Sequence, residues 1–474
     1  MISFILNNRL IRTEKPSGSS LLDFIRYEMD LPGTKCGCRE GDCGACTVLE
    51  GTCSNETINY KSIVSCLTPL VNVHGKHIVT IEGLNMQQLS PVQKAVSSNS
   101  ATQCGFCTPG VVVSLTSFCL SKSKPVIGTA IASVSGNICR CTGYKSIERA
   151  ASEITGLIKD KSISDPVKWL VNEKMLPDYF LTIPDRLSVI RPADSKSVLH
   201  DSIIVSGGTD LFVKRASELS EKEILSLSEK TELKSIISSG EKFSVGASVT
   251  ASEIGNSELL NRTIPGIKSF LNLVASEQVR NTGTLAGNIV NASPAADLSV
   301  IFLALRSSLT LEKDGHVSNL PLNKFYTGYK SISLENDEII RNIVFPLPEK
   351  QCLFNFEKVS RRTHLDIATV NSAVLLRTEG EMISECCLSA GGVSPFPLFL
   401  ERTSAFLVGK TISFGNIAAA SLIIQEEVTP ISDIRGSIEY KRLLLRQLFF
   451  AHFKELFPDI IDLKELTQRG REVM

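Results

Sequence analysis

The chain has 474 residues, too many for one hydrophobic core, and its length predicts about three domains. Fifty Lys and Arg balance fifty Asp and Glu, which excludes the basic surface typical of proteins that bind nucleic acid or an anionic membrane. No apolar run approaches the roughly 18 residues of a membrane-spanning helix, and the N-terminus lacks a signal-peptide pattern. Fourteen cysteines without a secretion signal indicate metal binding in a reducing compartment, so we expect a cytoplasmic protein.

The N-terminal residues predict a hairpin followed by a helix. Asn7-Asn8 stands between the apolar residues Phe4, Leu6 and Leu10, and Asn tolerates the backbone angles of a tight turn. Residues 19–29 place their apolar side chains on one helical face. A glycine-rich loop over 33–51 follows, and it contains most of the first group of cysteines.

The first group of cysteines has the C-x4-C-x2-C…C spacing of plant-type 2Fe–2S proteins. Its members are Cys38, Cys43, Cys46 and Cys66. Glycines suit a loop that must wrap a compact anionic cluster and aim backbone N–H groups at its sulfurs. The alternative is a zinc site, but zinc sites usually repeat paired short spacings. Cys36 lies two residues before Cys38 and does not fit the x4 spacing, whereas His74 and His77 are expected to be packing or surface residues.

The second group of cysteines has the spacing C-x2-C…C-x-C and lies in two segments that we expect to be helical, 103–120 and 136–154. Its members are Cys104, Cys107, Cys139 and Cys141. Thr108 and Pro109 suit the N-cap and first position of a helix. The cysteines would then lie at helix N-termini, where backbone N–H groups stabilise thiolates. A structural zinc site is again the alternative, and Cys119 is expected to be a core residue.

Further along, residues 159–181 contain charges, prolines and the only tryptophan, and we interpret them as a surface linker anchored by Trp169. From 182 onward, strand-like and helix-like runs alternate. Two glycine turns, one in 203–215 and one in 279–305, would let backbone amides approach a pyrophosphate closely. Neither is a G-x-G-x-x-G pattern, so a Rossmann site is unsupported, and each alone could be an ordinary tight turn.

The motifs CREGDCGACTV, QCGFCTPG and GNICRCTGY resemble the iron–sulfur region of the xanthine dehydrogenase family of molybdenum hydroxylases. The resemblance continues through most of the remaining chain and implies a multidomain α+β fold. Its domains would be a plant-type 2Fe–2S ferredoxin-like domain (1–80), a helical 2Fe–2S domain (81–158), a linker (159–181), a two-lobed FAD domain like that of vanillyl-alcohol oxidase (182–355) and an α/β C-terminal domain (356–474). In that last domain, 383–398 reads as a strand and glycine turn and 437–457 as an amphipathic helix, and Cys386 and Cys387 are assigned no metal.

The same resemblance implies an FAD site. The pyrophosphate would lie along Ile204, Val205, Ser206, Gly207, Gly208, Thr209, Asp210 and Leu211. Other flavin contacts would come from Val274, Thr284, Asn288, Asp297, Ile340 and Lys358. Without the motif, Lys358 would be interpreted as a solvated surface charge. Val274 stands where mammalian members have an aromatic residue, and Leu365 stands where an acidic residue often precedes the DIA aspartate.

The function implied is that of the electron-transfer subunit of a xanthine dehydrogenase. Electrons from hypoxanthine or xanthine would leave a molybdopterin centre on a large partner subunit, pass through the helical-domain cluster and the ferredoxin-like cluster to FAD, and reach NAD⁺. The family suggests a dimer of heterodimers. Two alternatives remain open: the iron–sulfur and flavin subunit of another molybdenum hydroxylase, acting on an N-heterocycle or aldehyde, and a stand-alone iron–sulfur flavin reductase.

Overall fold

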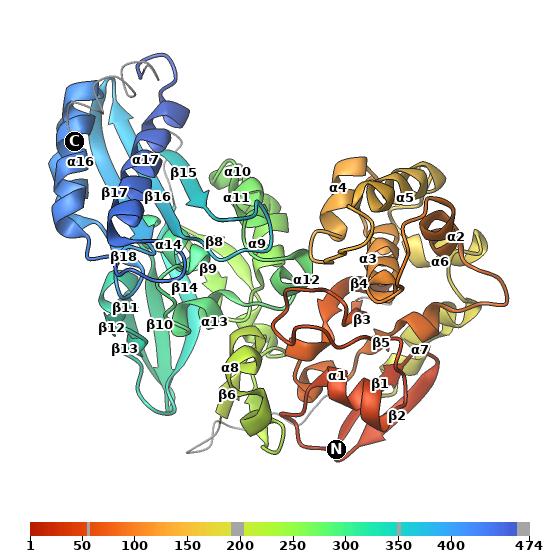
Figure 1. Cartoon of the computed structure of the whole chain (residues 1–474). Coiled ribbons are helices and arrows are strands. Elements are labelled where there is room, and N and C mark those ends of the chain that lie inside the picture. The colour runs from red at the N-terminus through yellow and green to blue at the C-terminus, as the bar shows by residue number, and fades with distance from the viewer. Residues whose placement is uncertain (55–56, 191–202, 348–351, 462–474) are drawn as a thin grey trace. The chain divides into compact units, whose positions relative to one another are not determined.

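The computed structural model describes residues 1–54, 57–190, 203–347 and 352–461 (Figure 1). They form two compact units. The first unit contains Met1–Glu229 and a returning segment, Ala275–Gly283. The second unit contains Lys230–Val274 and the chain from Thr284 onward. The chain therefore leaves the first unit, re-enters it for nine residues and leaves it again.

The first unit begins with a five-stranded sheet in the order β2-β1-β5-β3-β4. All neighbouring pairs are antiparallel except β1 with β5. The predicted hairpin at Asn7 is confirmed, with this residue at φ 54°. Phe4, Leu21 and Ile25 are among the buried residues of its core. The elements are β1 (Ile2–Leu6), β2 (Arg9–Thr13), α1 (Leu21–Asp23), η1 (Phe24–Glu28), β3 (Thr47–Ser54), β4 (Thr57–Val64), η2 (Ser65–Leu67), η3 (Leu70–Val73), β5 (His77–Val79) and η4 (Ile81–Leu84).

A helical part follows the sheet, and its central helix, α3, is buried from Gly110 to Leu120, Cys119 included. The prediction that Thr108 caps this helix is wrong by one residue. The N-cap is Cys107, because the Thr108 hydroxyl is instead paired with that of Thr102 at 2.7 Å. The helices are α2 (Pro91–Ser98), α3 (Thr108–Leu120), α4 (Ile127–Ser133), α5 (Lys145–Leu157), α6 (Pro166–Asn172), η5 (Asp178–Thr182) and α7 (Ile183–Ser188).

Residues 159–181 differ from the surface linker that the sequence suggested. Asp165 caps α6 by accepting the Lys168 N–H at 3.0 Å, and Leu170 and Phe180 are fully buried in the core of the helical part. Trp169 is only partly buried against that core. The apolar residues of this segment recur at helical spacing, and their burial outweighs the charges and prolines between them.

The first unit ends with a small β-α-β element, β6 (Ile203–Val205), α8 (Thr209–Leu219) and β7 (Ile224–Ser226), whose two strands are parallel. It is bonded to the N-terminal sheet domain: Asn72 donates to the Ser206 carbonyl at 2.8 Å and accepts from the Ser226 hydroxyl at 2.6 Å. The returning segment contains α12 (Glu277–Arg280).

The second unit contains two larger sheets, with strand orders β11-β10-β14-β9-β8 and β15-β16-β17-β18. Helix α14 packs on β16 and β17, and α17 packs on β15 and β16. The predicted strand that ends at a glycine turn is β17, and the predicted C-terminal helix is α17, capped by Ser437. The first part contains η6 (Thr231–Leu233), β8 (Ile236–Ser239), β9 (Lys242–Gly246), α9 (Ala251–Asn256), α10 (Glu258–Thr263), α11 (Ile267–Asn272), α13 (Leu285–Val290), α14 (Asp297–Ala304), β10 (Ser308–Lys313), β11 (His316–Pro321), η7 (Leu322–Lys324), β12 (Tyr326–Gly328), β13 (Ser331–Ile332) and β14 (Ile339–Pro346). The second part contains β15 (Cys352–Val359), β16 (Val370–Glu379), β17 (Met382–Gly391), β18 (Leu398–Phe399), α15 (Glu401–Leu407), α16 (Phe414–Glu427) and α17 (Ile438–Leu456).

Among the described residues, no helix is both long and apolar enough to cross a membrane.

Candidate cofactor sites

The first cysteine site lies between the loop that precedes β3 and the short helix η2. The thiols of Cys46 and Cys66 are 3.3 Å apart and both are buried. Cys38 and Cys43 form a second, partly exposed pair joined by a side-chain hydrogen bond. The Cys38 sulfur also accepts the backbone N–H groups of Glu40 at 3.3 Å and Cys43 at 3.4 Å. The four predicted ligands of this site are therefore brought together as two pairs.

Each pair favours one thiolate. The hydrogen bond from Cys43 lowers the pKa of Cys38 to about 5, and the hydrogen bond from Cys66 lowers that of Cys46. The pKa values of Cys43 and Cys66 are raised in return, since each donates to its partner. A thiolate, and not a thiol, is the form that binds metal.

The arrangement in pairs suits a two-iron cluster better than one zinc ion. A structural zinc ion needs four ligands around one point, whereas the irons of a 2Fe–2S cluster share four cysteines, two on each iron. Two separate thiol pairs therefore fit the 2Fe–2S cluster.

The loop around the first site requires glycine at specific positions. A Cβ atom on Gly37 would lie 2.8 Å from the Cys43 sulfur, so a larger residue would press on the thiol. Gly44 has φ +64°, and its Cβ would lie 2.3 Å from the Gly136 carbonyl oxygen. Cys36 belongs to neither pair and interacts instead with the Arg39 guanidinium.

The second cysteine site lies where α3 and α5 begin. Cys107 pairs with Cys139, and Cys104 pairs with Cys141, again as two pairs. The first pair is buried and the second is exposed to solvent. Burial raises the pKa of Cys139, but hydrogen bonds from Thr142, whose hydroxyl lies 3.1 Å from the sulfur, and from Cys107 outweigh burial and lower it.

The exposed edge of the second site is apolar. Phe106, Ile138 and Tyr144, each next to or near one of the cysteines in sequence, are at least 41% exposed. The sequence analysis did not single out these residues, because an isolated apolar residue in a loop has no periodicity that distinguishes a surface position from a core position.

The residues expected along the FAD pyrophosphate, Ile204 to Leu211, form β6, a Gly-Gly turn and the start of α8 in the first unit. A Cβ on Gly207 would lie 2.0 Å from the Thr282 carbonyl oxygen, and Gly208 has φ +82°, so both positions require glycine. Val205 and Phe212 belong to the same apolar cluster as Cys46 and Cys66. The predicted phosphate turn thus adjoins the buried pair of the first cysteine site.

The other predicted flavin residues lie in the second unit, and some of them meet. The side chain of Lys358 is buried and is not a solvated surface charge. Its ammonium group lies 2.7 Å from both the Asp297 carboxylate and the carbonyl oxygen of Leu273, the residue before Val274. Burial raises the pKa of Asp297, and this effect outweighs the lowering by Lys358 and by Asn371, which donates to the carboxylate at 2.5 Å.

Three further predicted positions are structural anchors here. The Thr284 hydroxyl caps α13 by accepting the Gly287 N–H at 3.2 Å, and Asn288 accepts from Ser299 at 3.1 Å. Ile340 is buried on β14.

Leu365 is buried with φ +60°, a left-handed conformation that is uncommon for a bulky residue and often marks a functional site.

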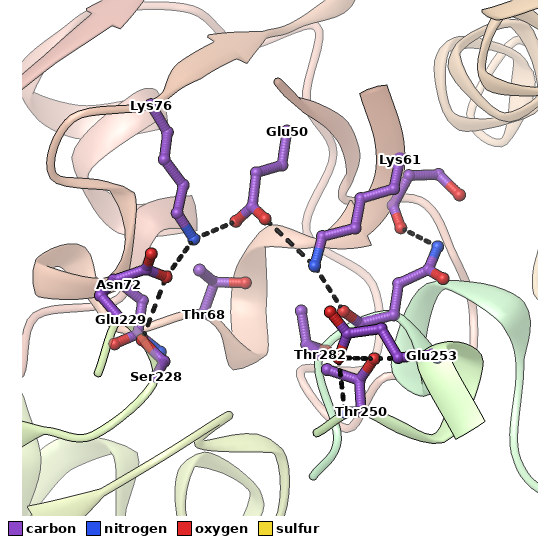
Figure 2. Close-up of polar contacts among 12 residues, drawn as sticks. Glu50, Lys61, Thr68, Asn72, Lys76, Ser228, Glu229, Thr250, Glu253 and Thr282 are labelled. Carbon is purple, nitrogen blue, oxygen red and sulfur yellow. Dashed lines mark hydrogen bonds and ion pairs between the residues drawn. The ribbon is translucent and has the colours of Figure 1, made fainter. Parts of the chain in front are cut away.

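A chain of charges in the first unit contains two buried members, Glu50 and Lys76, and no sequence pattern indicated it. Figure 2 shows Lys76 between Glu50 and Glu229, with ion pairs of 3.2 Å and 2.8 Å. Glu50 also forms an ion pair with Lys61 at 3.2 Å (Figure 2). Lys61 donates to the Asn281 carbonyl oxygen of the returning segment at 2.7 Å. Glu229 is the last residue before the chain first leaves the first unit, and Asn281 lies two residues before it leaves again. These contacts therefore hold both exit points of the chain.

Four family models match successive parts of the sequence. They are a 2Fe-2S iron-sulfur cluster binding domain over residues 4–71, a 2Fe-2S binding domain over 80–152, an FAD binding domain in molybdopterin dehydrogenase over 187–348, and a CO dehydrogenase flavoprotein C-terminal domain over 355–456. The chain therefore contains two 2Fe-2S binding domains, an FAD-binding domain and a flavoprotein C-terminal domain. The predicted multidomain α+β fold, with two 2Fe–2S domains and an FAD-binding domain, is confirmed.

Relatives of known activity match nearly all of this chain. Xanthine dehydrogenase 1 of Arabidopsis thaliana is 28% identical over 94% of the chain and 39% of its own length. Xanthine dehydrogenase/oxidase of Mus musculus is 27% identical over 96% of the chain and 38% of its own length. The chain thus spans about two fifths of these relatives. A carbon monoxide dehydrogenase structure from Hydrogenophaga pseudoflava superposes with a TM-score of 0.51 at 25% identity, covering 53% of this chain and 88% of that one.

Proposed function

We propose that this chain is the electron-transfer component of a xanthine dehydrogenase. Its eight paired cysteines would hold two 2Fe–2S clusters, and its FAD-binding domain would hold FAD. The clusters would supply single-electron transfer, and the flavin would supply exchange with NAD⁺, which takes two electrons. Oxidation of hypoxanthine or xanthine would take place at a molybdopterin centre on a partner chain.

The observation that carries the proposal is the position of the two cysteine sites within one unit. The buried pair Cys46 and Cys66 shares an apolar cluster with Val205 and Phe212, on either side of the turn expected to bind FAD. The outer pair of the second site, Cys104 and Cys141, faces solvent amid exposed apolar side chains. One site thus lies next to the turn that we expect to bind FAD, and the other lies at a surface that a partner could cover.

The outward face of the second site is where we expect the molybdenum-binding partner to dock. Apolar side chains beside two solvent-exposed thiols are the kind of surface that an interface removes from water. This placement supports the order in which electrons enter at the second site and leave from the first. We further propose a dimer of heterodimers and a cytoplasmic location.

Lys358 would serve the flavin. Its ammonium group is held by Asp297 and a backbone carbonyl, within a buried environment where a positive charge acts strongly on its neighbours. A fixed positive charge of this kind would stabilise negative charge on a reduced flavin. The ion pair also explains why a lysine is tolerated at a buried position.

The structural similarity to a carbon monoxide dehydrogenase favours one alternative, an electron-transfer component that serves a different molybdenum hydroxylase. The substrate would then be another N-heterocycle or an aldehyde. The substrate pocket would belong to the partner in either case, so the alternative shares every residue role given above.

The test is xanthine-dependent reduction of NAD⁺ by the native complex, isolated through a tag on this chain and followed anaerobically as NADH absorbance. Formation of NADH by the wild type and by Cys53→Ser, which changes an exposed cysteine outside both sites, with loss of NADH in Cys43→Ser, would support the proposal. If xanthine bleaches the cluster and flavin absorbance but no NADH forms, the acceptor assignment is wrong. If nothing bleaches although a molybdenum subunit is present, the xanthine assignment is wrong and the alternative takes its place.

A further inference from the structure

The returning segment Ala275–Gly283 places one glutamine at the centre of the first unit. Gln278, on α12, has no solvent exposure. Its amide nitrogen lies within donating distance of three acceptors: the Ser114 hydroxyl at 3.0 Å, the Ser133 carbonyl oxygen at 3.2 Å and the Asn137 side-chain oxygen at 3.3 Å. A single side chain therefore contacts α3, the end of α4 and the loop that leads to Cys139.

Asn137 extends these contacts to the first cysteine site. Its amide nitrogen donates to the Gly44 carbonyl oxygen at 2.9 Å, and its side-chain oxygen accepts from the Ser114 hydroxyl at 2.8 Å. The next residue, Ile138, donates its N–H to the Cys43 carbonyl oxygen at 3.0 Å. Gly44 follows Cys43, and Asn137 lies two residues before Cys139, so the network joins the two cysteine loops directly.

The backbones around this network are in close contact. A Cβ on Gly136 would lie 2.1 Å from the Gln278 side-chain oxygen. A Cβ on Gly110, in α3, would lie 2.3 Å from the Gly44 carbonyl oxygen. Neither glycine position has space for a larger side chain. A shift of one loop would therefore press on the other loop or on the returning segment.

The stability of the fold does not by itself account for a glutamine at this position. The buried oxygen of the Gln278 side chain has no hydrogen-bond partner, and an unsatisfied buried acceptor is unfavourable. An apolar side chain of the same length would avoid that cost. What the amide alone provides is two N–H donors shared among three acceptors, which fix the loops in one relative position.

We propose that Gln278 is a positioning residue that holds the two cysteine loops in register with each other and with the returning segment. The proposal rests on the proposed function, because the loops are taken to hold two 2Fe–2S clusters. Gln278 touches neither group of cysteines and acts through Asn137 and Ser114. Without its amide, the backbone around Gly44 and Asn137 is free to shift, and the surroundings of both clusters change.

The test uses the full-length chain with its clusters, reduced with dithionite and measured by electron paramagnetic resonance and by redox titration. In Gln278→Met, iron and acid-labile sulfide are expected to remain at the wild-type level. The reduction potential of at least one cluster and the spin–spin interaction between the two are expected to shift. Ser114→Ala removes one member of the network and is expected to shift the same signals by less.

Gln93→Met is the matched control. It removes the amide that accepts the Ser90 N–H at 2.8 Å in the capping box of α2, so it lowers stability in the same unit away from both sites. It is expected to leave the spectrum and the potentials unchanged. Unchanged spectra and potentials in Gln278→Met would overturn the proposal, and if that variant does not fold, unchanged values in Ser114→Ala would overturn it. A wild-type chain without iron and sulfide would instead contradict the proposed function.

Discussion

Each cysteine site has one buried pair and one outer pair, but the outer pair is half-buried in the first site (Cys38 and Cys43) and exposed in the second (Cys104 and Cys141). In the first site, Cys46 and Cys66 are 2% and 4% exposed and lie in an apolar cluster with residues of β6 and α8. In the second site, Cys104 and Cys141 lie at the surface. Under the proposed function, the first site would exchange electrons within this chain, and the second would exchange them with a partner molecule.

Local structure explains the difference. The first site is closed by a sheet: Cys46 precedes β3, Cys66 follows β4 in η2, and the two strands pair along their whole length. The second site is held by helix starts, with Cys107 at the N-cap of α3 and Cys141 shortly before α5. Cys107 is buried at its helix start, and burial raises its pKa to about 12, whereas Cys141 lies outside the helix and is exposed.

The largest effect predicted from this comparison concerns the buried charges beside the first site. Glu50 lies on β3, and Glu50→Gln would leave the buried Lys76 with only the more exposed Glu229 as an ionic partner. We expect a loss of about 3 kcal/mol in the free energy of unfolding, measured by denaturant titration of the full chain.

The matched control for Glu50 is Glu148→Gln on α5, beside the second site, where the ion pair with Lys145 is exposed. Its loss is expected to be below about 0.5 kcal/mol. Similar losses of unfolding free energy in the two variants would contradict the difference in burial between these two ion pairs.

The second prediction exchanges one sulfur in each site for oxygen. Cys46→Ser places a hydroxyl in an apolar cluster, and we expect it to remove the first cluster and to lower the stability of the chain by about 1–3 kcal/mol. Cys104→Ser is expected to remove only the second cluster, with a stability change below about 0.5 kcal/mol, because its side chain is exposed. Cluster content by absorbance and stability by denaturation check this, and a larger stability loss in Cys104→Ser would reverse the comparison.

The third prediction concerns pH. His77, on β5 of the domain that holds the first site, is buried with its ring nitrogens bonded to the Tyr60 hydroxyl at 2.7 Å and the Asn7 carbonyl oxygen at 2.9 Å, and burial lowers its pKa to about 3. Because its pKa is near 6.5 in the unfolded chain, stability is full above pH 6.5 and falls as the pH decreases towards 3, by about 1.4 kcal/mol for each unit.

Denaturation at pH 7.5, 6.5 and 5.5, followed by the fluorescence of Trp169 in the first unit, measures this effect. Tyr60→Phe is a useful companion, since it removes one bond to the histidine while keeping the ring buried. His77→Gln is expected to be less stable at pH 7.5 and to have a flatter profile. An equal slope in wild type and His77→Gln would show that another group titrates.

The mildest test of the comparison leaves the sequence unchanged. In the chain freed of iron, Cys104 and Cys141 are expected to react with iodoacetamide before Cys46 and Cys66, because solvent reaches only the former pair. Mass spectrometry of peptides at successive times measures the order. Simultaneous labelling of all four cysteines would mean that Cys46 and Cys66 are as accessible to solvent as Cys104 and Cys141.

Much of the local structure could be predicted from the sequence because short patterns determine it. The Asn7 turn, the cysteine spacings and the strand–glycine–helix unit at Gly207 each depend on residues close together in the chain. Even there, the cap of α3 was misassigned, because Thr108 pairs with Thr102 and does not cap the helix.

The contacts that join the sites could not be predicted in this way. Gln278 and Asn137 are 141 residues apart, and Lys61 and Asn281 are 220 apart. Each of these residues is polar and isolated in the sequence, so only the fold shows which partner it bonds to. The same holds for Lys358, whose ion pair with Asp297 joins two elements distant in the chain.

The most direct test of the central claim is the content of iron, acid-labile sulfide and zinc in the purified wild-type chain and in Cys46→Ser and Cys104→Ser. Two clusters with two irons each predict about four irons and four sulfides in the wild type and about two of each in either variant. Zinc without sulfide, or iron that is unchanged in both variants, would contradict the account of two separate 2Fe–2S sites.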